Sequence, residues 1–216
     1  MIKKIFEFNR VILTMVVIEF FMNGAFAIIG PFFAIFVTQE IIGGDAKVVG
    51  FSAAIYWIVK SIFQLPISRW LDRTDGERDE FWALFISYLL SAIVPIIYFF
   101  AYLPSHVYLA QGLLGFLFAW AVPSWYSLFT RHLDKFRISF EWSLYSVVSV
   151  GISTALAAAG AGLLVDRFGF RIIFILSSAI IIASALSYLN IRKHLYPRRE
   201  SLEKVIPEAK AKVNGR

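Results

Sequence analysis

The sequence predicts an all-helical protein with six transmembrane helices, and three observations carry that prediction. Hydrophobic residues make up 59% of the 216 residues and charged residues only 17%, whereas charged residues form about a quarter of a typical soluble domain. The apolar residues fall into six runs of roughly 20 residues or more, the length that an α-helix needs to cross a bilayer. A polar Asp-Arg turn also occurs twice at matching places, which indicates a chain built from two related units.

The expected spans follow from these apolar runs and from the turn residues between them. Ile42-Gly43-Gly44-Asp45 is a turn signal after the first run, and Leu103-Pro104-Ser105 is another after the third. The expected limits are about Val11–Val37, Val48–Ser68, Phe81–Leu103, Val107–Thr130, Trp142–Val165 and Ile172–Ile191. Residues 1–10 then form a short N-terminal segment, residues 11–191 the membrane domain, and residues 192–216 a polar, basic tail.

Lysine and arginine residues are distributed unevenly between the two sides of these spans. Three of them precede or begin the first span, three lie in each of the loops after the second and fourth spans, and eight lie in the tail, whereas the opposite loops hold three. Basic residues accumulate on the cytoplasmic side of a membrane. We therefore expect a multi-pass protein of the inner cell membrane with both termini in the cytoplasm. This topology accounts for the net charge of +6 without nucleic acid as a partner.

Residues for enzyme chemistry are missing from the sequence. It contains no cysteine, so disulfides and thiolate metal sites are excluded. His106, His132 and His194 lie at span edges without the spacing of metal ligands. Neither a Gly-x-Ser-x-Gly segment nor a phosphate-binding glycine-rich loop with lysine is present. We expect neither an enzyme nor a cofactor.

The turn after the second span carries the most specific pattern. It reads Ser68-x3-Asp72-Arg73-x2-Gly76-Glu77-Arg78, and Asp166-Arg-x-Gly-x-Arg171 nearly repeats its core after the fifth span. Charged groups beside hydrocarbon are costly unless they are paired, so such a turn is unusual between membrane helices. The topology places its two copies on opposite faces of the membrane, as an inverted repeat requires.

This turn resembles the G-x3-D-R-x2-G-R-R loop between helices two and three of the major facilitator superfamily. The chain has Ser68 for the first glycine and Glu77 for one arginine. The fourth span is also similar, with Gln111-Gly-Leu-Leu-Gly115, Val122-Pro123-Ser124 and a terminal Arg131, although family members commonly carry arginine in place of Gln111. In the fifth span, Gly151-x8-Gly160 opens like the family's antiporter motif but lacks the Gly-Pro that follows there.

The resemblance implies one half of a major facilitator fold, of the N-terminal type and built from two inverted three-helix repeats. It also implies a secondary transporter that works by alternating access. The two halves of such transporters are related by an axis along the membrane normal. Because six is an even number, a second copy of the chain inserts in the same orientation, and a homodimer reproduces that axis. The expected partners are therefore a second copy, the lipid bilayer and a small-molecule substrate, with proton coupling as an option. The alternatives are a non-transporting accessory or scaffold protein and an excised N-terminal half of a twelve-helix transporter.

Glu19 and Lys60 are the two charged residues within the expected spans. Each lies nine residues from a basic residue at the cytoplasmic edge, which places both about 13 Å deep. An isolated charge at that depth costs several kcal/mol, so an ion pair between them is expected, as part of a substrate pathway or as a structural link between two helices. The expected substrate and proton pathway comprises Glu19, Asn23, Trp57, Lys60, Gln64, Gln111 and Trp120. For the two tryptophans, helix packing is the alternative.

The loop residues Asp72, Arg73, Gly76 and Arg78 are expected to act as a conformational latch. In the family that the chain resembles, the aspartate of this loop contacts a helix end of the opposite half and stabilises the outward-facing state. A carboxylate at a helix N-terminus is favourable by about 0.3–1 kcal/mol when exposed. Arg131 and Glu141, at cytoplasmic helix ends, are candidate members of the same gating group. The alternative is that the loop arginines only fix the orientation of the chain in the membrane.

Overall fold

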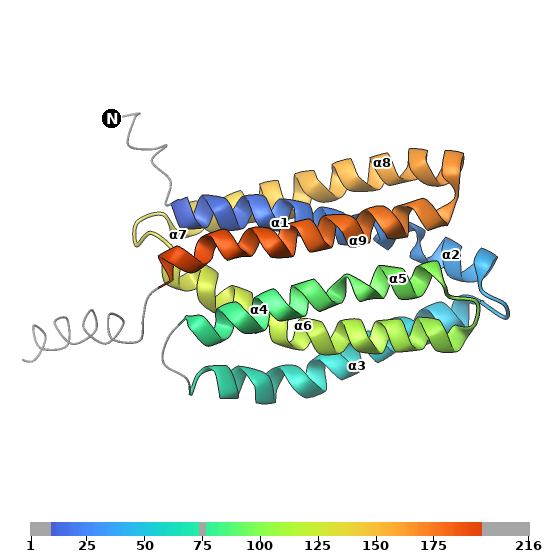
Figure 1. Ribbon diagram of the computed structural model, residues 1–216, viewed down its shortest axis with the longest axis horizontal. Coiled ribbons are helices and arrows are strands. Elements are labelled where there is room, and N and C mark those ends of the chain that lie inside the picture. Colours follow the sequence, from blue (N-terminus) through green and yellow to red (C-terminus); the bar gives the residue numbers. More distant parts are fainter. Residues whose placement is uncertain (1–9, 74–76, 196–216) are drawn as a thin grey trace, which may run out of the picture.

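The computed structural model describes residues 10–73 and 77–195, and these form helices and no strand. Six helical spans are long and apolar enough to cross a membrane, which confirms the predicted fold class (Figure 1). The first span consists of α1 (Arg10–Ile29), η2 (Gly30–Phe32) and α2 (Phe33–Glu40), and the second is α3 (Ala46–Leu71). The third is α4 (Arg78–Ser91) with α5 (Ile93–Phe99), and the fourth is α6 (Pro104–His132). The fifth is α7 (Ile138–Leu144), η3 (Tyr145–Ile152) and α8 (Ser153–Phe168), and the sixth is α9 (Phe170–Ser187) with η4 (Tyr188–His194).

The helices extend beyond the apolar runs by several residues at most ends. The sixth reaches His194, so the expected tail starts within a helical turn and not after it. The remaining expectations for residues 1–9 and for the tail from residue 196 lie outside the described residues. Polar residues can continue a helix because its backbone hydrogen bonds do not depend on an apolar side chain, and a turn residue ends it.

Two turns explain how neighbouring spans reverse direction. A Cβ atom on Gly44 would lie 1.9 Å from the carbonyl oxygen of Val37, so only glycine fits there. Asp45 then caps α3, because its side chain accepts a hydrogen bond from the amide of Val48 at 2.9 Å. Gly169 has a φ of +77° and separates α8 from α9, a conformation that glycine adopts at little cost.

The fifth span contains an irregular helical segment that could not be predicted from its sequence. Residues Tyr145–Ile152 form a π-helix, in which hydrogen bonds join residues five apart. Within it, the hydroxyl of Ser149 donates to the carbonyl of Val16 on α1 at 2.7 Å. The π-helical segment therefore packs against the first span through a buried polar contact.

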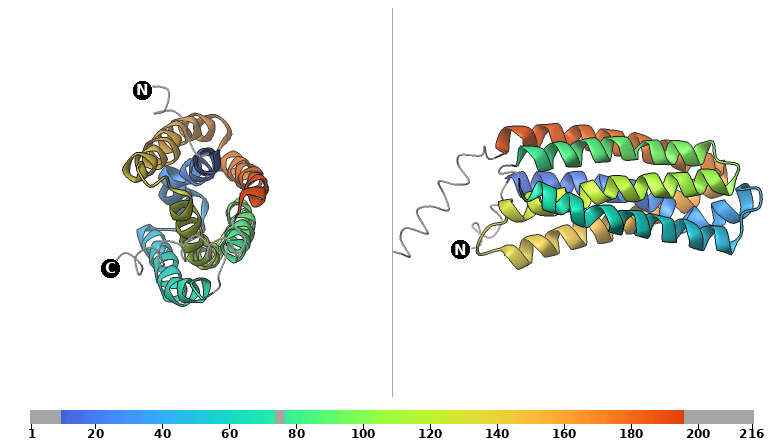
Figure 2. Two further views of the ribbon diagram at one scale, coloured as in Figure 1. Left: turned by 90° about the vertical axis from the view of Figure 1, so that its left-hand side faces the viewer. Right: turned by 90° about the horizontal axis from the view of Figure 1, so that it is seen from below.

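An end-on view shows how the spans are arranged (Figure 2). The second span, α3, and the fifth span, ending in α8, lie at opposite edges of the bundle, with α1 and α6 between them. The third and sixth spans cover the other side. Of the six, the second and fifth are the least buried within the chain. The Asp72 turn lies at the end where α1 begins and the Asp166 turn at the other end, as the inverted repeat predicts (Figure 1).

Candidate functional site

Glu19 is the most buried charged side chain in the middle of the bundle. It projects from α1 toward the third and sixth spans and is 3% exposed. The hydroxyls of Tyr88 on α4 and Tyr188 on η4 donate to its Oε1 at 2.9 and 2.7 Å. Asn23, one turn along α1, donates to its Oε2 at 3.0 Å. Both carboxyl oxygens thus have donors, which is the condition for burying such a group.

The surroundings of this carboxyl group are apolar or aromatic. Glu19 lies in a core formed by side chains such as Met15, Met22, Leu84 and Ile181. A polar cluster of this kind, fully hydrogen-bonded in a low-dielectric interior, fixes the rotation of three spans relative to one another.

The expected ion pair between Glu19 and Lys60 is not formed, so that prediction was wrong for this conformation. The reason is helix rotation, since α1 turns Glu19 toward α4 and η4 while α3 packs mainly against α6. Lys60 is half-buried, and its Nζ lies 4.9 Å from the ring centre of Trp57 and 5.8 Å from that of Tyr56. Cation–π contact of this kind stabilises an ammonium group in place of a carboxylate.

Aromatic side chains connect the two charged residues indirectly. Tyr56, beside Lys60, lies 6.4 Å from the ring of Phe118 on α6. Phe118 lies in turn 6.2 Å from the ring of Tyr88, which binds Glu19. It also meets Phe26 of α1 edge-on at 5.1 Å. Phe118 carries no polar group, so nothing in the sequence distinguished it from the many apolar residues of its span.

The other expected pathway residues are spread along the bundle. Trp57 is 59% exposed on α3. Gln64 is half-buried on the same helix, where its carbonyl accepts a hydrogen bond from Ser68. Gln111 is half-buried on α6, near Tyr98 of α5. Trp120 packs edge-on against Trp70 at 5.8 Å, nearer the end of the bundle that carries the Asp72 turn. The structure therefore brings Glu19 and Asn23 together, and Trp57 and Lys60 together, but leaves Gln111 and Trp120 apart from both pairs.

The expected latch residues lie at the end of the bundle where α1 begins. Asp72 and Arg73 are exposed at the C-terminal end of α3, and Arg78 is exposed at the start of α4. A hollow of about 600 Å³ lies beside this end of α3 and is lined in part by Arg69, Asp72 and Arg73. Gly76 lies outside the described residues.

Two buried carboxylates in this region had not been expected. Glu80 is 1% exposed, and its Oε1 accepts hydrogen bonds from Arg131 at 2.8 Å and from Ser127 at 3.2 Å. Glu77, 2% exposed, has its Oε2 3.7 Å from the Nε2 of His132. Together they join the start of α4 to the end of α6. Their spacing of three residues, one helical turn, was the signal in the sequence that could have indicated a shared face.

Arg131 and Glu141, which we expected in one gating group, have different principal partners. Arg131 binds Glu80. Glu141 is fully buried, and its Oε2 accepts a hydrogen bond from the amide of Asp134 at 3.0 Å. It therefore holds the loop between α6 and α7 in place.

Replacing Arg131 with glutamine should destabilise the protein, because buried Glu80 loses its cation. We expect a loss of about 1–3 kcal/mol. A fully buried pair would cost more, but the Arg131 side chain is 38% exposed. Thermal unfolding in detergent measures the effect, and the exposed Lys135→Gln at the same end is the control. Equal effects of the two substitutions would show that the Arg131–Glu80 pair contributes nothing.

Comparisons with known proteins identify the fold and the family model that fits it. A model described as Major Facilitator Superfamily matches residues 15–214. Among solved structures, the chain is similar to one titled "In meso crystal structure of the POT family transporter PepTSo", with a TM-score of 0.71 and 15% sequence identity. The match covers 89% of this chain and 39% of that one, so the chain spans less than half of that transporter's length. No curated protein sequence matches the chain.

Proposed function

We propose that this chain, which belongs to the Major Facilitator Superfamily, forms one half of a secondary transporter and that a second copy supplies the other half. The observation that carries the proposal is the position of the two least buried spans, α3 and the span that ends in α8, at opposite edges of one face. An exposed pair of edges around a shared face is what a six-helix half needs to receive a second half. No enzyme activity is proposed.

The geometry of a two-fold axis specifies which helices would meet. If the axis runs along the membrane normal beside the face between α3 and α8, rotation by 180° brings α8 of the partner against α3. On α3, Tyr56 packs on α6 where its carbonyl approaches Gly115, and the next residue, Trp57, is exposed. On α8, Ala157 packs near Gly24 of α1, and the next residue, Ala158, is half-exposed. Consecutive side chains of an α-helix point about 100° apart. Because α3 and α8 run in opposite directions at opposite edges of the bundle, Trp57 and Ala158 both point toward the same face.

The substrate pathway would run along that face between the two copies. Lys60 and Asn23 are its polar residues, and Tyr56 and Phe118 supply half-buried aromatic surface between them. Lys60 is suited to an anionic group of the substrate, because its contacts with the rings of Tyr56 and Trp57 leave its positive charge uncompensated. Gln64 lies one turn beyond Lys60 and extends the same polar strip.

Glu19 would serve as a proton acceptor located behind this surface. Tyr88, Tyr188 and Asn23 all donate to its carboxyl group, and Phe118 separates it from Lys60. Movement of Phe118 during alternating access would change the access of protons to Glu19. Proton coupling of this kind would link the state of the carboxyl group to the state of the pathway.

The exposed Asp72 would act as the latch by meeting a helix end of the partner copy. The hollow beside Arg69, Asp72 and Arg73 provides space for such an end. The latch operates on the cytoplasmic side. The proposal therefore includes insertion in the inner membrane with both termini in the cytoplasm. The expected tail can contact anionic lipid on that side.

Uptake into proteoliposomes tests the proposal. We expect the purified chain to accumulate at least one member of a panel of small organic ions, sugars and amphipathic drugs, and to respond to an imposed pH gradient. Lys60→Gln should lower uptake of an anionic or zwitterionic substrate at least tenfold, whereas Lys47→Gln, at the exposed start of α3, should not. A correctly inserted dimer that transports nothing in the panel would instead favour the scaffold function.

A further inference from the structure

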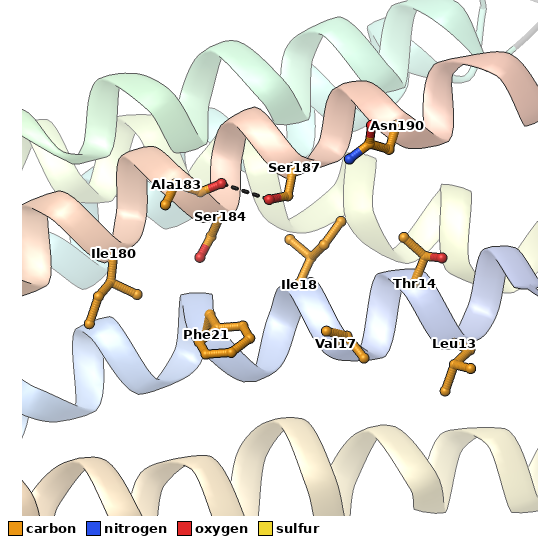
Figure 3. A pocket seen from close by; sticks show the side chains of 10 residues that line it. All are labelled: Leu13, Thr14, Val17, Ile18, Phe21, Ile180, Ala183, Ser184, Ser187 and Asn190. Carbon is orange, nitrogen blue, oxygen red and sulfur yellow. Dashed lines mark hydrogen bonds between the residues drawn. The ribbon is translucent and has the colours of Figure 1, made fainter.

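A groove on the outside of the bundle has no role in the proposed transport function. It runs between α1 and the sixth span, has a volume of about 550 Å³, and opens outward (Figure 3). Leu13, Val17 and Phe21 of α1 form one wall, and all three are exposed. The volume lies in the range of about 300–1,000 Å³ that is typical of ligand sites.

The groove exists because small side chains of α9 face larger ones of α1. Ala183, Ser184 and Ser187 line it opposite the apolar wall, so the two helices leave space between them. Ser184 is 4% exposed, and its hydroxyl has no hydrogen-bond partner among the described residues. In Figure 3 this hydroxyl points from α9 toward α1. An acceptor within the groove would give this hydroxyl the partner that buried hydroxyls normally have.

The length of the groove matches one leaflet of a bilayer. From Leu13 to Phe21 the wall rises about 12 Å along α1. The hydrocarbon core of a bilayer is about 30 Å thick, so one leaflet contributes about half of that. Both flanking helices are membrane spans, and the groove begins near the end where α1 starts.

Charge at the mouth of the groove selects among lipids. None of the residues that line the groove is charged. Arg10 lies one turn before Thr14 on the groove side of α1, and Lys193 lies one turn after Asn190 on η4, and both are exposed. A lipid tail is already in hydrocarbon before it binds, so the apolar wall confers little preference. The two cations confer it instead, because they attract a headgroup with a net negative charge.

We propose that this groove binds an anionic phospholipid of the leaflet at the end of the bundle where α1 begins. One acyl chain lies against Leu13, Val17 and Phe21, the ester groups lie beside the serine side chains of α9, and the headgroup lies between Arg10 and Lys193. This site is independent of transport, so its failure and that of the proposed function are separate results.

Native mass spectrometry of the full chain, titrated with phosphatidylglycerol and phosphatidylcholine of equal acyl chains, tests the proposal. We expect one phosphatidylglycerol molecule to bind about tenfold more tightly than phosphatidylcholine. Arg10→Gln and Lys193→Gln should each weaken its binding about fivefold. Ala183→Leu and Ser187→Leu, which fill the groove, should abolish this site.

Two matched controls decide between the groove and a general effect of charge. Ala179 is exposed on α9 outside the groove, so Ala179→Leu should leave binding unchanged. Arg192 is next to Lys193, but its guanidinium lies over the ring of Trp82 on α4 at 5.4 Å, so Arg192→Gln should also leave it unchanged. Equal binding of the two lipids, an effect of Arg192→Gln as large as that of Lys193→Gln, or binding that survives both groove-filling variants would each overturn the proposal.

Discussion

Replacing Glu19 with alanine is expected to lower the free energy of unfolding by about 2–4 kcal/mol. The substitution removes the acceptor for the hydroxyls of Tyr88 and Tyr188, and leaving these buried donors unsatisfied is costly. It also leaves a cavity between three spans. Unfolding of the purified protein in detergent, followed by temperature or denaturant, measures the loss.

Glu19→Gln separates this structural contribution from the proposed proton coupling. The amide oxygen of glutamine can still accept from both tyrosines, so most of the stability should remain. The amide does not titrate, so we expect uptake to become insensitive to an imposed pH gradient. Tyr88→Phe and Tyr188→Phe are the controls, since each removes one hydrogen bond and leaves the carboxyl group in place. A glutamine variant that is as unstable as the alanine variant, or that keeps its response to pH, would contradict these expectations.

Replacing Ala158 with tryptophan is expected to prevent dimer formation and to reduce transport at least tenfold. Ala158 is half-exposed on α8, and its neighbour Ala157 packs near Gly24 of α1, so we assign Ala158 to the face proposed for the partner. Small residues allow membrane helices to approach closely, and an indole ring at such a position holds them apart. Counting subunits by stepwise photobleaching in liposomes measures the dimer.

Ala179→Trp is the matched control for this substitution. Ala179 is an exposed alanine of α9, which lies outside the proposed face. The control should leave both the dimer and transport intact. Loss of transport in Ala158→Trp without loss of the dimer would show that α8 is not at the interface.

The spans and their turns could be predicted from the sequence because bilayer thickness constrains the length of an apolar helix. Rotation of each helix about its own axis could not be predicted in the same way. A helix that is apolar on all sides gives no periodic signal for the side that faces its neighbours. Glu19 was therefore paired with Lys60, whereas Tyr88 and Tyr188 bind it.

The buried residues at the cytoplasmic end of the proposed topology were missed for a related reason. Glu77 and Glu80 precede the apolar run that was expected to begin at Phe81, so they fell outside the expected spans. In the structure α4 begins at Arg78 and carries Glu80 inward to Arg131. The π-helical segment at Tyr145–Ile152 likewise has no composition that distinguishes it from an α-helix. It depends on the contact of Ser149 with α1, which is a property of the assembled bundle.

Cysteine cross-linking in native membranes is the most direct test of the central claim that two copies pair through α3 and α8. The chain contains no cysteine, so introduced pairs report without background. Trp57 lies eleven residues after Ala46, and Ala158 lies ten residues before Phe168, which places them about 17 and 15 Å from the same end of the bundle. The control pair, Leu90 on α4 and Ala179 on α9, lies at a similar depth outside the proposed face. A short thiol-reactive cross-linker should produce dimers from Trp57→Cys with Ala158→Cys and none from the control pair. Monomers alone from the first pair, or dimers in equal yield from both, would contradict the proposed assembly.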